Sequence, residues 1–410
     1  MTERSTAPVV VVGAGLAGLA CAQRLSRAGR EVVVLEAAGE VGGRVRTEVI
    51  DGFRCDRGFQ LINPAYPALS EVVDPAALDL RRFEAGVVVA RGAERLTLAD
   101  PRRSPGRLPG TLRAPLGSTM EKLRFALWAA GSLRPVRATL DRPDRTLAAD
   151  LDAYGITGPL RSGVIEPFLA GVLAEREGST SANFARLLIR SFVLGSPSVP
   201  SLGMGRFPEL MAASLPPGTI RLNSPVERVA ARAVFTEAGV MPAAAVVVAT
   251  DPGTAARLTG RPATRMKALT TFWHASAEPP SRDALLHVDA DRRGPVINTA
   301  VLTAAAPTYA PAGRSLVATT VLGADGSVAA EQEASRHAGL IYGADHASWE
   351  LVRTHVIAEA LPEQPPPLRL GRPPSTPDGL VIAGDHQETA SIQGALVSGF
   401  RAARAVQQRR

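Results

Sequence analysis

The chain has 410 residues, of which 45% are hydrophobic and 21% charged, and a formal net charge of +7 at pH 7. No stretch approaches the run of about 18 apolar residues that reads as a membrane-spanning helix, and two cysteines give neither a disulfide framework nor a metal site. The positive charge comes from scattered arginines without an aromatic-rich basic stripe, which argues against nucleic acid as a partner.

The length predicts two domains, because one hydrophobic core rarely organises so many residues. Met1 to Pro8 are polar and too short for a signal peptide. Together with the low cysteine content, this favours a reducing, cytoplasmic location.

Residues 9–36 have the pattern of a strand, a glycine-rich turn, a helix and a second strand. Val9 to Val12 form a β-branched run typical of a strand buried on both faces. Three glycines follow in the spacing G-x-G-x-x-G: Gly13, Gly15 and Gly18. In that spacing they allow a tight turn, a close approach of the backbone to a pyrophosphate, and close packing of the next helix on the sheet. We expect this helix over about 16–28, with phosphate bound at its N-terminus.

Glu36 ends the second predicted strand, where its carboxylate can accept both hydroxyl protons of an adenosine ribose. A free 2′-hydroxyl is therefore expected, and NADP is disfavoured. Gly42, Gly43 and Arg44 then favour FAD over NAD. The two glycines expose N–H groups to a diphosphate, and Arg44 can balance its charge or lie against the isoalloxazine edge.

At this point the chain resembles the flavoprotein superfamily that contains the amine oxidases, the protoporphyrinogen oxidases and the phytoene-desaturase-like enzymes. The matching residues are Gly13, Gly15, Gly18, Glu36, Gly42, Gly43 and Arg44. The segments Asp56 to Gln60 and Asn63 to Pro67 look more like the phytoene-desaturase-like branch. The resemblance implies an α/β fold with a Rossmann-like FAD-binding domain and a second, mixed-sheet plus helical substrate domain.

Residues 83–200 and 264–370 are expected to form that substrate domain, with helices that cover the flavin. From 118 to 137, Leu123, Ala126, Leu127 and Ala130 fall on one helical face among basic residues. This pattern fits an interfacial helix in peripheral contact with anionic lipid, and it equally fits an ordinary packed helix. Thr270 to His274 and Ser315 to Thr320 are predicted strands.

A second motif lies near the C-terminal end. Leu380 to Asp385 read as a strand that runs into Gly384 and Asp385, and the last helix is expected to start at Ser391. The resemblance implies that Asp385 contacts the ribityl or pyrophosphate part of FAD and that the helix start faces flavin N1, where its dipole favours negative charge. The alternative for Asp385 is a plain turn residue.

Both motifs must meet in space, so we expect a discontinuous FAD-binding domain made of residues 1–82, 201–263 and 371–410. FAD is expected to bind noncovalently. The predicted FAD-binding residues, from motifs and resemblance together, are Gly13, Ala14, Gly15, Leu16, Ala17, Gly18, Glu36, Ala37, Gly42, Gly43, Arg44, Gly58, Phe59, Gln60, Val226, Gly384, Asp385, Ser391, Ile392, Gln393 and Ala395.

Three residues are candidates for a catalytic role beside the flavin, and no metal is expected. Lys267 opens a predicted strand, where many amine oxidases of the superfamily place a lysine that is water-linked to flavin N5; the alternative is a solvated edge residue. Gln60 is expected either to face the substrate side of the ring or to bind nearby main chain. His386 is either an acid–base group or a loop histidine.

Three functions remain open. The first is an FAD-dependent dehydrogenase or desaturase that oxidises a C–C bond of an apolar, isoprenoid-like substrate, which the Asp56 to Gln60 segment favours. The segment Ala390 to Ile392 also stands where many amine oxidases carry an aromatic residue, which argues against simple amines as substrates. The second is an amine or amino-acid oxidase that uses oxygen, favoured by Lys267. The third is a flavin-binding protein without turnover.

Overall fold

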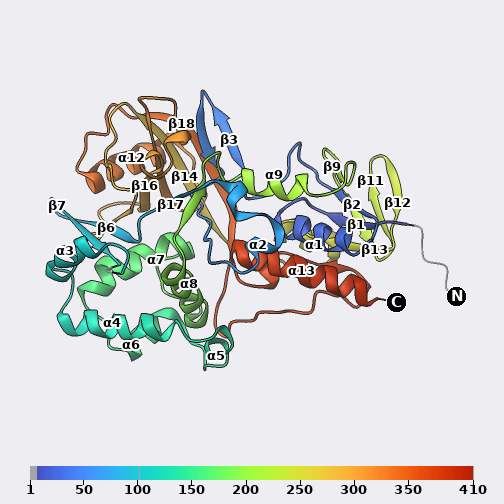
Figure 1. Ribbon diagram of the computed structural model, residues 1–410, viewed down its shortest axis with the longest axis horizontal. Coiled ribbons are helices and arrows are strands. Elements are labelled where there is room, and N and C mark those ends of the chain that lie inside the picture. Colours follow the sequence, from blue (N-terminus) through green and yellow to red (C-terminus); the bar gives the residue numbers. More distant parts are fainter. Residues whose placement is uncertain (1–6, 101, 410) are drawn as a thin grey trace.

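A five-stranded parallel sheet forms the centre of one lobe of the elongated molecule (Figure 1). In the order β19-β13-β1-β2-β9 its strands are Val381–Ile382, Ala245–Val248, Val9–Val12, Val32–Leu35 and Ile220–Arg221. The strand β1 pairs residue for residue with β13 on one side and β2 on the other. Its four valines are all buried, as expected of a central parallel strand. This computed structural model describes residues 7–100 and 102–409, so most of the polar segment Met1 to Pro8 lies outside the described residues.

Two long helices pack against each other in the same lobe. The helix α1 (Leu16–Arg27) follows the glycine turn as predicted, and α13 (Ile392–Gln408) brings the second motif to it. A side chain at Gly399 of α13 would lie 2.3 Å from the Ala17 oxygen of α1, so only glycine permits this close contact. Two shorter helices, α9 (Arg206–Ala213) and α10 (Pro252–Thr259), lie in the intervening chain.

A mixed seven-stranded sheet forms the other lobe. In the order β18-β14-β17-β16-β15-β6-β7 its strands are Glu350–Pro362, Met266–Ser276, Ser315–Leu322, Val296–Val301, Leu286–Asp289, Gly86–Arg91 and Glu94–Ala99. All of its pairings are antiparallel except that of β15 with β6. The two strands predicted at 270–274 and 315–320 lie within β14 and β17, and α12 (Val328–Tyr342) packs on this sheet.

Several small elements lie outside the two large sheets. They are the hairpin β3 and β4 (Thr47–Ile50, Phe53–Asp56), the pair β5 and β8 (Leu80–Arg82, Ser198–Pro200), the three-stranded sheet β10 to β12 (Arg228–Ala230, Ala233–Thr236, Gly239–Pro242), and the short helices α2 (Leu69–Val72) and α11 (Leu302–Ala305). The hairpin β3–β4 rises where the lobes join (Figure 1).

A group of helices, which we name the helical unit (residues 119–194), lies below the seven-stranded sheet (Figure 1). It comprises α4 (Thr119–Gly131), α5 (Val136–Leu140), α6 (Leu147–Ala153), α7 (Glu166–Leu173) and α8 (Ala182–Leu194), and α3 (Leu108–Arg113) precedes it. A single helix over 118–137 is therefore wrong, because the segment is interrupted after Gly131 and Pro135 caps a new helix.

The outward face of α4 differs from what a packed helix requires. Glu121 and Trp128 are its buried side chains, whereas Leu123 is 52% and Leu127 60% exposed, and Ala126 and Ala130 are exposed as well. The predicted apolar face therefore points to solvent, and the expectation of an ordinary packed helix is wrong for this face. Tertiary packing, which the sequence pattern does not report, selected the face carrying Trp128.

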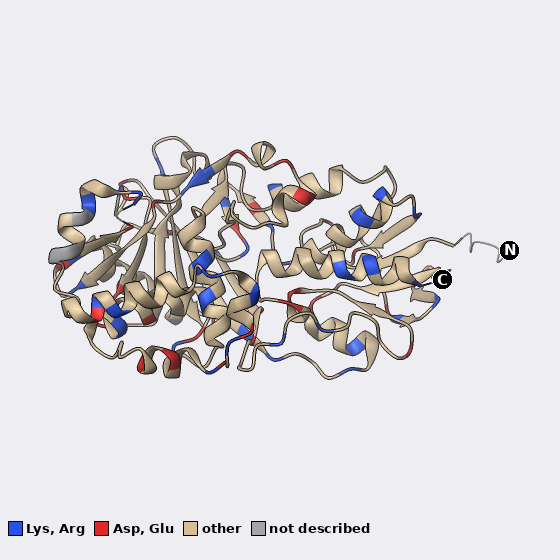
Figure 2. Ribbon diagram, turned by 60° about the horizontal axis from the view of Figure 1, so that its bottom comes forward, with Lys and Arg blue, Asp and Glu red and all other residues tan. Residues whose placement is uncertain are grey.

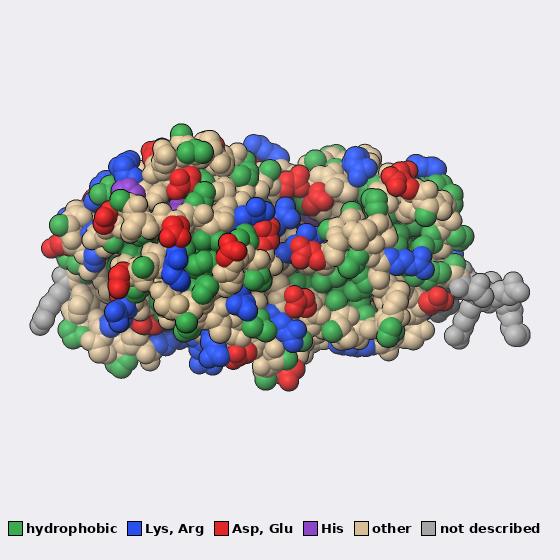
Figure 3. Space-filling view, turned by 90° about the horizontal axis from the view of Figure 1, so that it is seen from above, with side chains coloured by type: hydrophobic (Ala, Val, Ile, Leu, Met, Phe, Trp, Pro, Cys, Tyr) green, Lys and Arg blue, Asp and Glu red, His purple; other side chains and the backbone are tan. Residues whose placement is uncertain are grey.

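Charge is otherwise spread over both lobes. Lys and Arg occur along the whole molecule (Figure 2), and the face seen from above mixes apolar, basic and acidic side chains (Figure 3). Within residues 7–100 and 102–409, no helix is long and apolar enough to cross a membrane.

Candidate cofactor site

The glycine turn after β1 leaves open space in front of the N-terminus of α1. A Cβ on Gly13 would lie 2.8 Å from the Ala249 oxygen, and one on Gly18 would lie 2.0 Å from the Gly13 oxygen, so chain packing alone requires both glycines. A Cβ on Gly15 would meet no described atom within 4 Å, yet Gly15 is the N-cap of α1 and no side chain caps this helix. Open space in front of uncapped N–H groups fits a bound pyrophosphate.

Glu36 faces the same turn. One carboxylate oxygen accepts the N–H of Ala14 at 2.7 Å and the other accepts that of Ala38 at 2.9 Å. Gly42 donates its N–H to the Ala14 oxygen, so the Gly-Gly-Arg segment lies against the glycine turn. The first motif therefore forms one continuous backbone surface with a carboxylate at its edge.

Arg44 joins the first motif to the second. Its guanidinium donates to Asp385 Oδ1 at 2.6 Å and to the carbonyl of Ala360, in β18, at 2.7 Å. Burial by itself lowers the pKa of Arg44, but the Asp385 carboxylate outweighs this effect and raises it. The two motifs, 341 residues apart in sequence, thus meet at a charged pair whose Asp385 side chain is only 6% exposed.

Gln60 binds main chain. Its amide donates to the carbonyls of Arg44 at 2.7 Å and Arg57 at 2.9 Å, so it supports the loop that carries Arg44. This is the second of the two roles expected for it. Gly58 and Phe59 rest on the seven-stranded sheet, where Phe59 N–H approaches Thr271 Oγ1 at 3.4 Å.

Asp56, at the start of the same loop, is buried and holds three separate segments together through hydrogen bonds. It accepts hydrogen bonds from Thr47 Oγ1 at 2.6 Å, Met204 N–H at 2.8 Å and Tyr309 Oη at 2.8 Å. Burial raises the pKa of its carboxyl to about 6, although these hydrogen bonds oppose the shift. Asp56 therefore ties hairpin β3–β4 to the chain before α9 and to residues of the other lobe.

The start of α13 lies close to Asp385. Ser391 caps this helix by accepting the Gly394 N–H at 3.0 Å, and Gln393 accepts the Ala68 N–H at 3.1 Å. Gly384 donates to Ser398 Oγ at 3.0 Å. These bonds fix the helix start beside the Arg44–Asp385 pair, while Ile392 and Ala395 are half-buried on the first turn.

His386 is not a surface loop residue. Its ring is buried and folds back against Gly384, where a Cβ would lie 2.4 Å from the ring. Burial lowers its pKa, and within the described residues its Nδ1 has no hydrogen-bond partner. Its position next to Asp385 keeps it at the candidate site.

Lys267 is not a solvated edge residue either. Its ammonium donates to the carbonyl of Leu173, the last residue of α7, at 2.9 Å and to Thr180 Oγ1 at 3.0 Å. Burial lowers its pKa, which the charge of Glu175 partly offsets. A cavity of about 10 Å³ lies beside Lys267 and is also lined by Ala390, the residue before the α13 cap. Lys267 is thus close to the start of α13, and among the described residues no hydrogen bond joins it to Gln60 or His386.

Of the other predicted FAD-binding residues, Val226 is buried with apolar residues of β1 and β2, and Ala37 is exposed at the end of β2.

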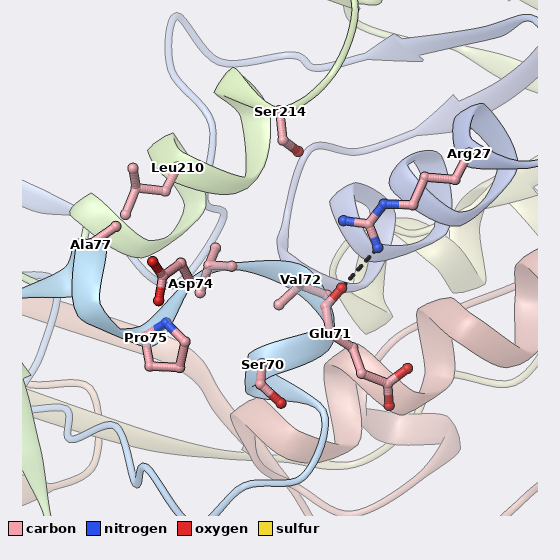
Figure 4. A pocket seen from close by; sticks show the side chains of 10 residues that line it. Arg27, Ser70, Glu71, Val72, Asp74, Pro75, Ala77, Leu210 and Ser214 are labelled. Atoms are coloured by element: carbon pink, nitrogen blue, oxygen red, sulfur yellow. Dashed lines mark hydrogen bonds between the residues drawn. The ribbon is translucent and has the colours of Figure 1, made fainter.

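A second, larger hollow, of about 500 Å³, opens between α1, the 70–77 segment and α9 (Figure 4). Arg27 reaches across it to the Glu71 carbonyl at 2.8 Å, and none of the predicted site residues lines it. In the part of the chain that the structure describes, no cluster of three or more His, Cys, Asp or Glu is arranged to hold a metal ion.

Two residues that lie near the site were not predicted from the sequence. Arg46 lies 4.0 Å from the Glu36 carboxylate, and its buried Nε has no partner among the described residues. Its place two residues after Arg44 is a signal that could have drawn attention to it. Gln364 lines the cavity beside Lys267, and nothing in the sequence around it indicates that position.

The chain matches the family of flavin containing amine oxidoreductases over residues 16–407. It is 46% identical over 79 residues to putrescine oxidase of Kocuria rosea, a stretch that covers 19% of this chain and 16% of that protein. It is 40% identical over 70 residues to protoporphyrinogen oxidase 2 of Arabidopsis thaliana, covering 17% and 14%. These stretches therefore span well under a fifth of either relative's length.

Solved structures resemble the whole fold. An oxidoreductase from Methanosarcina mazei aligns with a TM-score of 0.78 and 18% identity, covering 97% of this chain and 100% of that one. A putative protoporphyrinogen oxidase from Exiguobacterium sp. 255-15 aligns with a TM-score of 0.76 and 18% identity, covering 100% of both. At this identity, the likeness concerns the fold.

Proposed function

Because the chain belongs to the flavin containing amine oxidoreductase family, and is an FAD-dependent oxidoreductase, we propose that it dehydrogenates a C–C bond of an apolar substrate. FAD, when bound, supplies the redox chemistry by accepting a hydride at N5. The substrate class is isoprenoid-like, in keeping with the resemblance of Asp56 to Gln60 to the phytoene-desaturase-like branch.

The apolar surroundings of Ala390 carry this proposal. Ala390 precedes the α13 cap and belongs to the same hydrophobic cluster as the cores of α6, α7 and α8. The small cavity beside it is lined mainly by apolar side chains, with Lys267 as the one charged group and no carboxylate. These apolar surroundings of Ala390 suit a hydrocarbon chain, and no carboxylate lines the cavity to pair with the ammonium group of an amine substrate.

The residues of the two motifs would hold noncovalent FAD. The α1 N-terminus and Gly15 would bind the pyrophosphate, and Glu36 the adenosine ribose. Arg44 and Asp385 would lie along the diphosphate and ribityl chain, and the α13 start would face the flavin. We assign this role to residues 1–82, 201–263 and 371–410, and substrate binding to 83–200 and 264–370.

The test is reduction of the bound flavin by candidate substrates without oxygen. Carotenoid precursors and related polyenes should bleach the flavin absorbance, and a quinone or oxygen should restore it. Putrescine, other primary amines and amino acids should leave it unchanged. Rapid bleaching by amines, with none by polyenes, contradicts the proposal.

An amine or amino-acid oxidase that uses oxygen is the second candidate, favoured by Lys267. Its ammonium lies beside a cavity of about 10 Å³, roughly the volume that one water needs. In this function Lys267 holds a water and assists reoxidation of the reduced cofactor by oxygen. If Lys267→Met left the reoxidation rate unchanged, this candidate would lose its support.

We further propose that the exposed face of α4 contacts an anionic membrane surface from which an apolar substrate enters. Met120, Leu123 and Leu127 are each more than half exposed, and Leu133 and Val136 continue the apolar surface. Arg124, Arg134 and Arg137 are exposed around it, and the single acid between 118 and 137, Glu121, is buried. Apolar side chains within a basic rim suit anionic lipid headgroups.

Between membrane contacts we place the protein in the cytoplasm, because Cys21 and Cys55 are both free and buried, as in a reducing compartment.

Sedimentation with phosphatidylglycerol–phosphatidylcholine vesicles checks this contact. We expect binding that weakens with salt and falls at least about tenfold in the Leu123→Ser/Leu127→Ser variant, since each buried leucine contributes about 1.5–3 kcal/mol. The matched control, Val240→Ser/Leu351→Ser, removes two other exposed apolar side chains and should bind as the parent does. Equal loss in both variants would argue against the α4 face.

A further inference from the structure

The small cavity beside Lys267 lies where several separate segments converge. It is bounded by the end of α7, the first residues of β14, the last residues of β18 and the residue before the α13 cap. Its volume of about 10 Å³ is at the lower limit for one water molecule, too small for a substrate or for a side chain. What it holds therefore depends on the polar groups in its walls.

Lys267 provides a donor. An ammonium group has three N–H bonds, and two of those on Lys267 are directed to Leu173 O and Thr180 Oγ1. The third has no acceptor among the described residues. The two bonds hold the ammonium in place, because both acceptors are themselves fixed. One is the carbonyl at the end of α7, and the other is the hydroxyl of Thr180, whose main-chain N–H donates to Glu175.

Gln364 provides an acceptor. It is 92% buried, its main-chain oxygen accepts Ser181 N–H at 2.8 Å, and its side-chain amide donates to the Glu388 carbonyl at 3.3 Å. Within residues 7–100 and 102–409, its Oε1 has no hydrogen-bond partner. Turning the amide over would set two oxygens against each other at Glu388, so the orientation is fixed. A buried acceptor left without a partner is unfavourable, which points to a ligand in the cavity.

We propose that Gln364 is a positioning residue that, together with Lys267, holds and orients a single water molecule in this cavity. The water accepts the third Lys267 N–H and donates one O–H to Gln364 Oε1. One O–H and one lone pair then remain, and both are directed away from these two partners. Lysine alone would leave the water free to rotate, whereas the glutamine acceptor fixes which of its hydrogens is available.

The proposal deepens the assignment of the α13 start to the flavin and rests on it. Ala390 lines the cavity and directly precedes the Ser391 cap of α13, so under that assignment the water would lie on the side of the site that faces the cofactor. Gln364 then acts on the reaction only through the water and Lys267, by ordering the proton that accompanies reoxidation of the cofactor.

Stopped-flow reoxidation of the photoreduced holoprotein by oxygen, together with a crystal structure of each variant, tests the proposal. Gln364→Leu should slow reoxidation about tenfold, the loss expected for one oriented hydrogen bond, and the ordered water should disappear. Gln364→Glu, which keeps an acceptor, should retain the water and most of the rate. In a Lys267→Met background, the further change Gln364→Leu should cost less than about twofold, because the two residues serve one water.

Gln23→Leu is the matched control. Gln23 is another buried glutamine whose Oε1 lacks a partner among the described residues, but its amide binds Val72, Met211 and Ser214 away from the cavity. It should lower the thermal midpoint and leave the reoxidation rate unchanged. Equal slowing by Gln364→Leu with and without Lys267, or an empty cavity in the parent crystal, would overturn the proposal. A protein that binds no FAD would instead refute the proposed function.

Discussion

The five-stranded sheet and the helical unit are stabilised in different ways. Close packing stabilises the sheet, since the β1 valines are buried on both faces and Gly13 and Gly18 of the turn leave no room for a side chain. The helical unit has a buried charge at its centre, where Arg186 binds Asp150 Oδ2 at 2.7 Å and lies over the Trp128 ring. Trp128 Nε1 donates to the same oxygen at 2.8 Å. A closely packed apolar core tolerates few substitutions, but a substitution there leaves no buried charge without a partner. In the helical unit, by contrast, removing either Arg186 or Asp150 leaves the other as a buried charge without this partner.

Breaking the buried pair should have the largest effect. Among the described residues, Arg186→Leu leaves the Asp150 carboxylate with the half-exposed Arg145 as its one ion-pair partner, which is expected to cost about 3–5 kcal/mol of unfolding free energy in urea denaturation. Asp150→Leu/Arg186→Leu should regain part of the loss because no charge stays buried. Glu209→Gln, which breaks an exposed pair with Arg206, should cost less than about 1 kcal/mol. Similar losses for the exposed and the buried pair would contradict the comparison.

A pH series should extend the comparison to Asp56, which lies between the lobes. Its carboxyl has a pKa of about 6 in the folded protein against 3.8 in a model peptide, so the folded state holds this proton more tightly. The resulting stability is present below pH 3.8 and is lost as the pH rises through 6, a change on the order of 3 kcal/mol. Asp56→Asn should remove this component, which the difference between the two unfolding curves from pH 4 to pH 7 measures. A constant difference across that range would contradict the expectation.

The smallest effect should come from Gly15→Ala, which tests whether shape in the sheet lobe serves the cofactor. Gly15 has an ordinary φ of −72° and open space at its Cβ, so the variant should fold with its thermal midpoint almost unchanged. Its FAD affinity should fall about tenfold, because the methyl group enters the space of the pyrophosphate. Fluorescence titration with FAD measures this. Gly106→Ala, another glycine with open space, is the control and should bind FAD as the parent does.

What could be predicted from the sequence follows the same division. The strand β1, the helix α1 and the meeting of Arg44 with Asp385 follow from local backbone rules and one family resemblance. The exposure of the α4 face that carries Leu123 could not be predicted in this way. It follows from the hydrogen bond of Trp128 to Asp150, which turns the opposite face of α4 inward and joins two separate helices. Gln364 and the bond of Lys267 to Leu173 likewise depend on tertiary packing, and neither leaves a periodic pattern in the sequence.

The position of β19 and α13 has a consequence for biosynthesis. During synthesis, β13 lacks its outer neighbour and the Ala17 side of α1 lacks Gly399 until residues 381–408 have left the ribosome. At about 5–20 residues per second, the nascent chain thus carries an open strand edge and an uncovered helix for many seconds before its two motifs can join. Chaperones that shield such edges, and the supply of FAD at the moment of closure, would then govern how much of the chain reaches the native state.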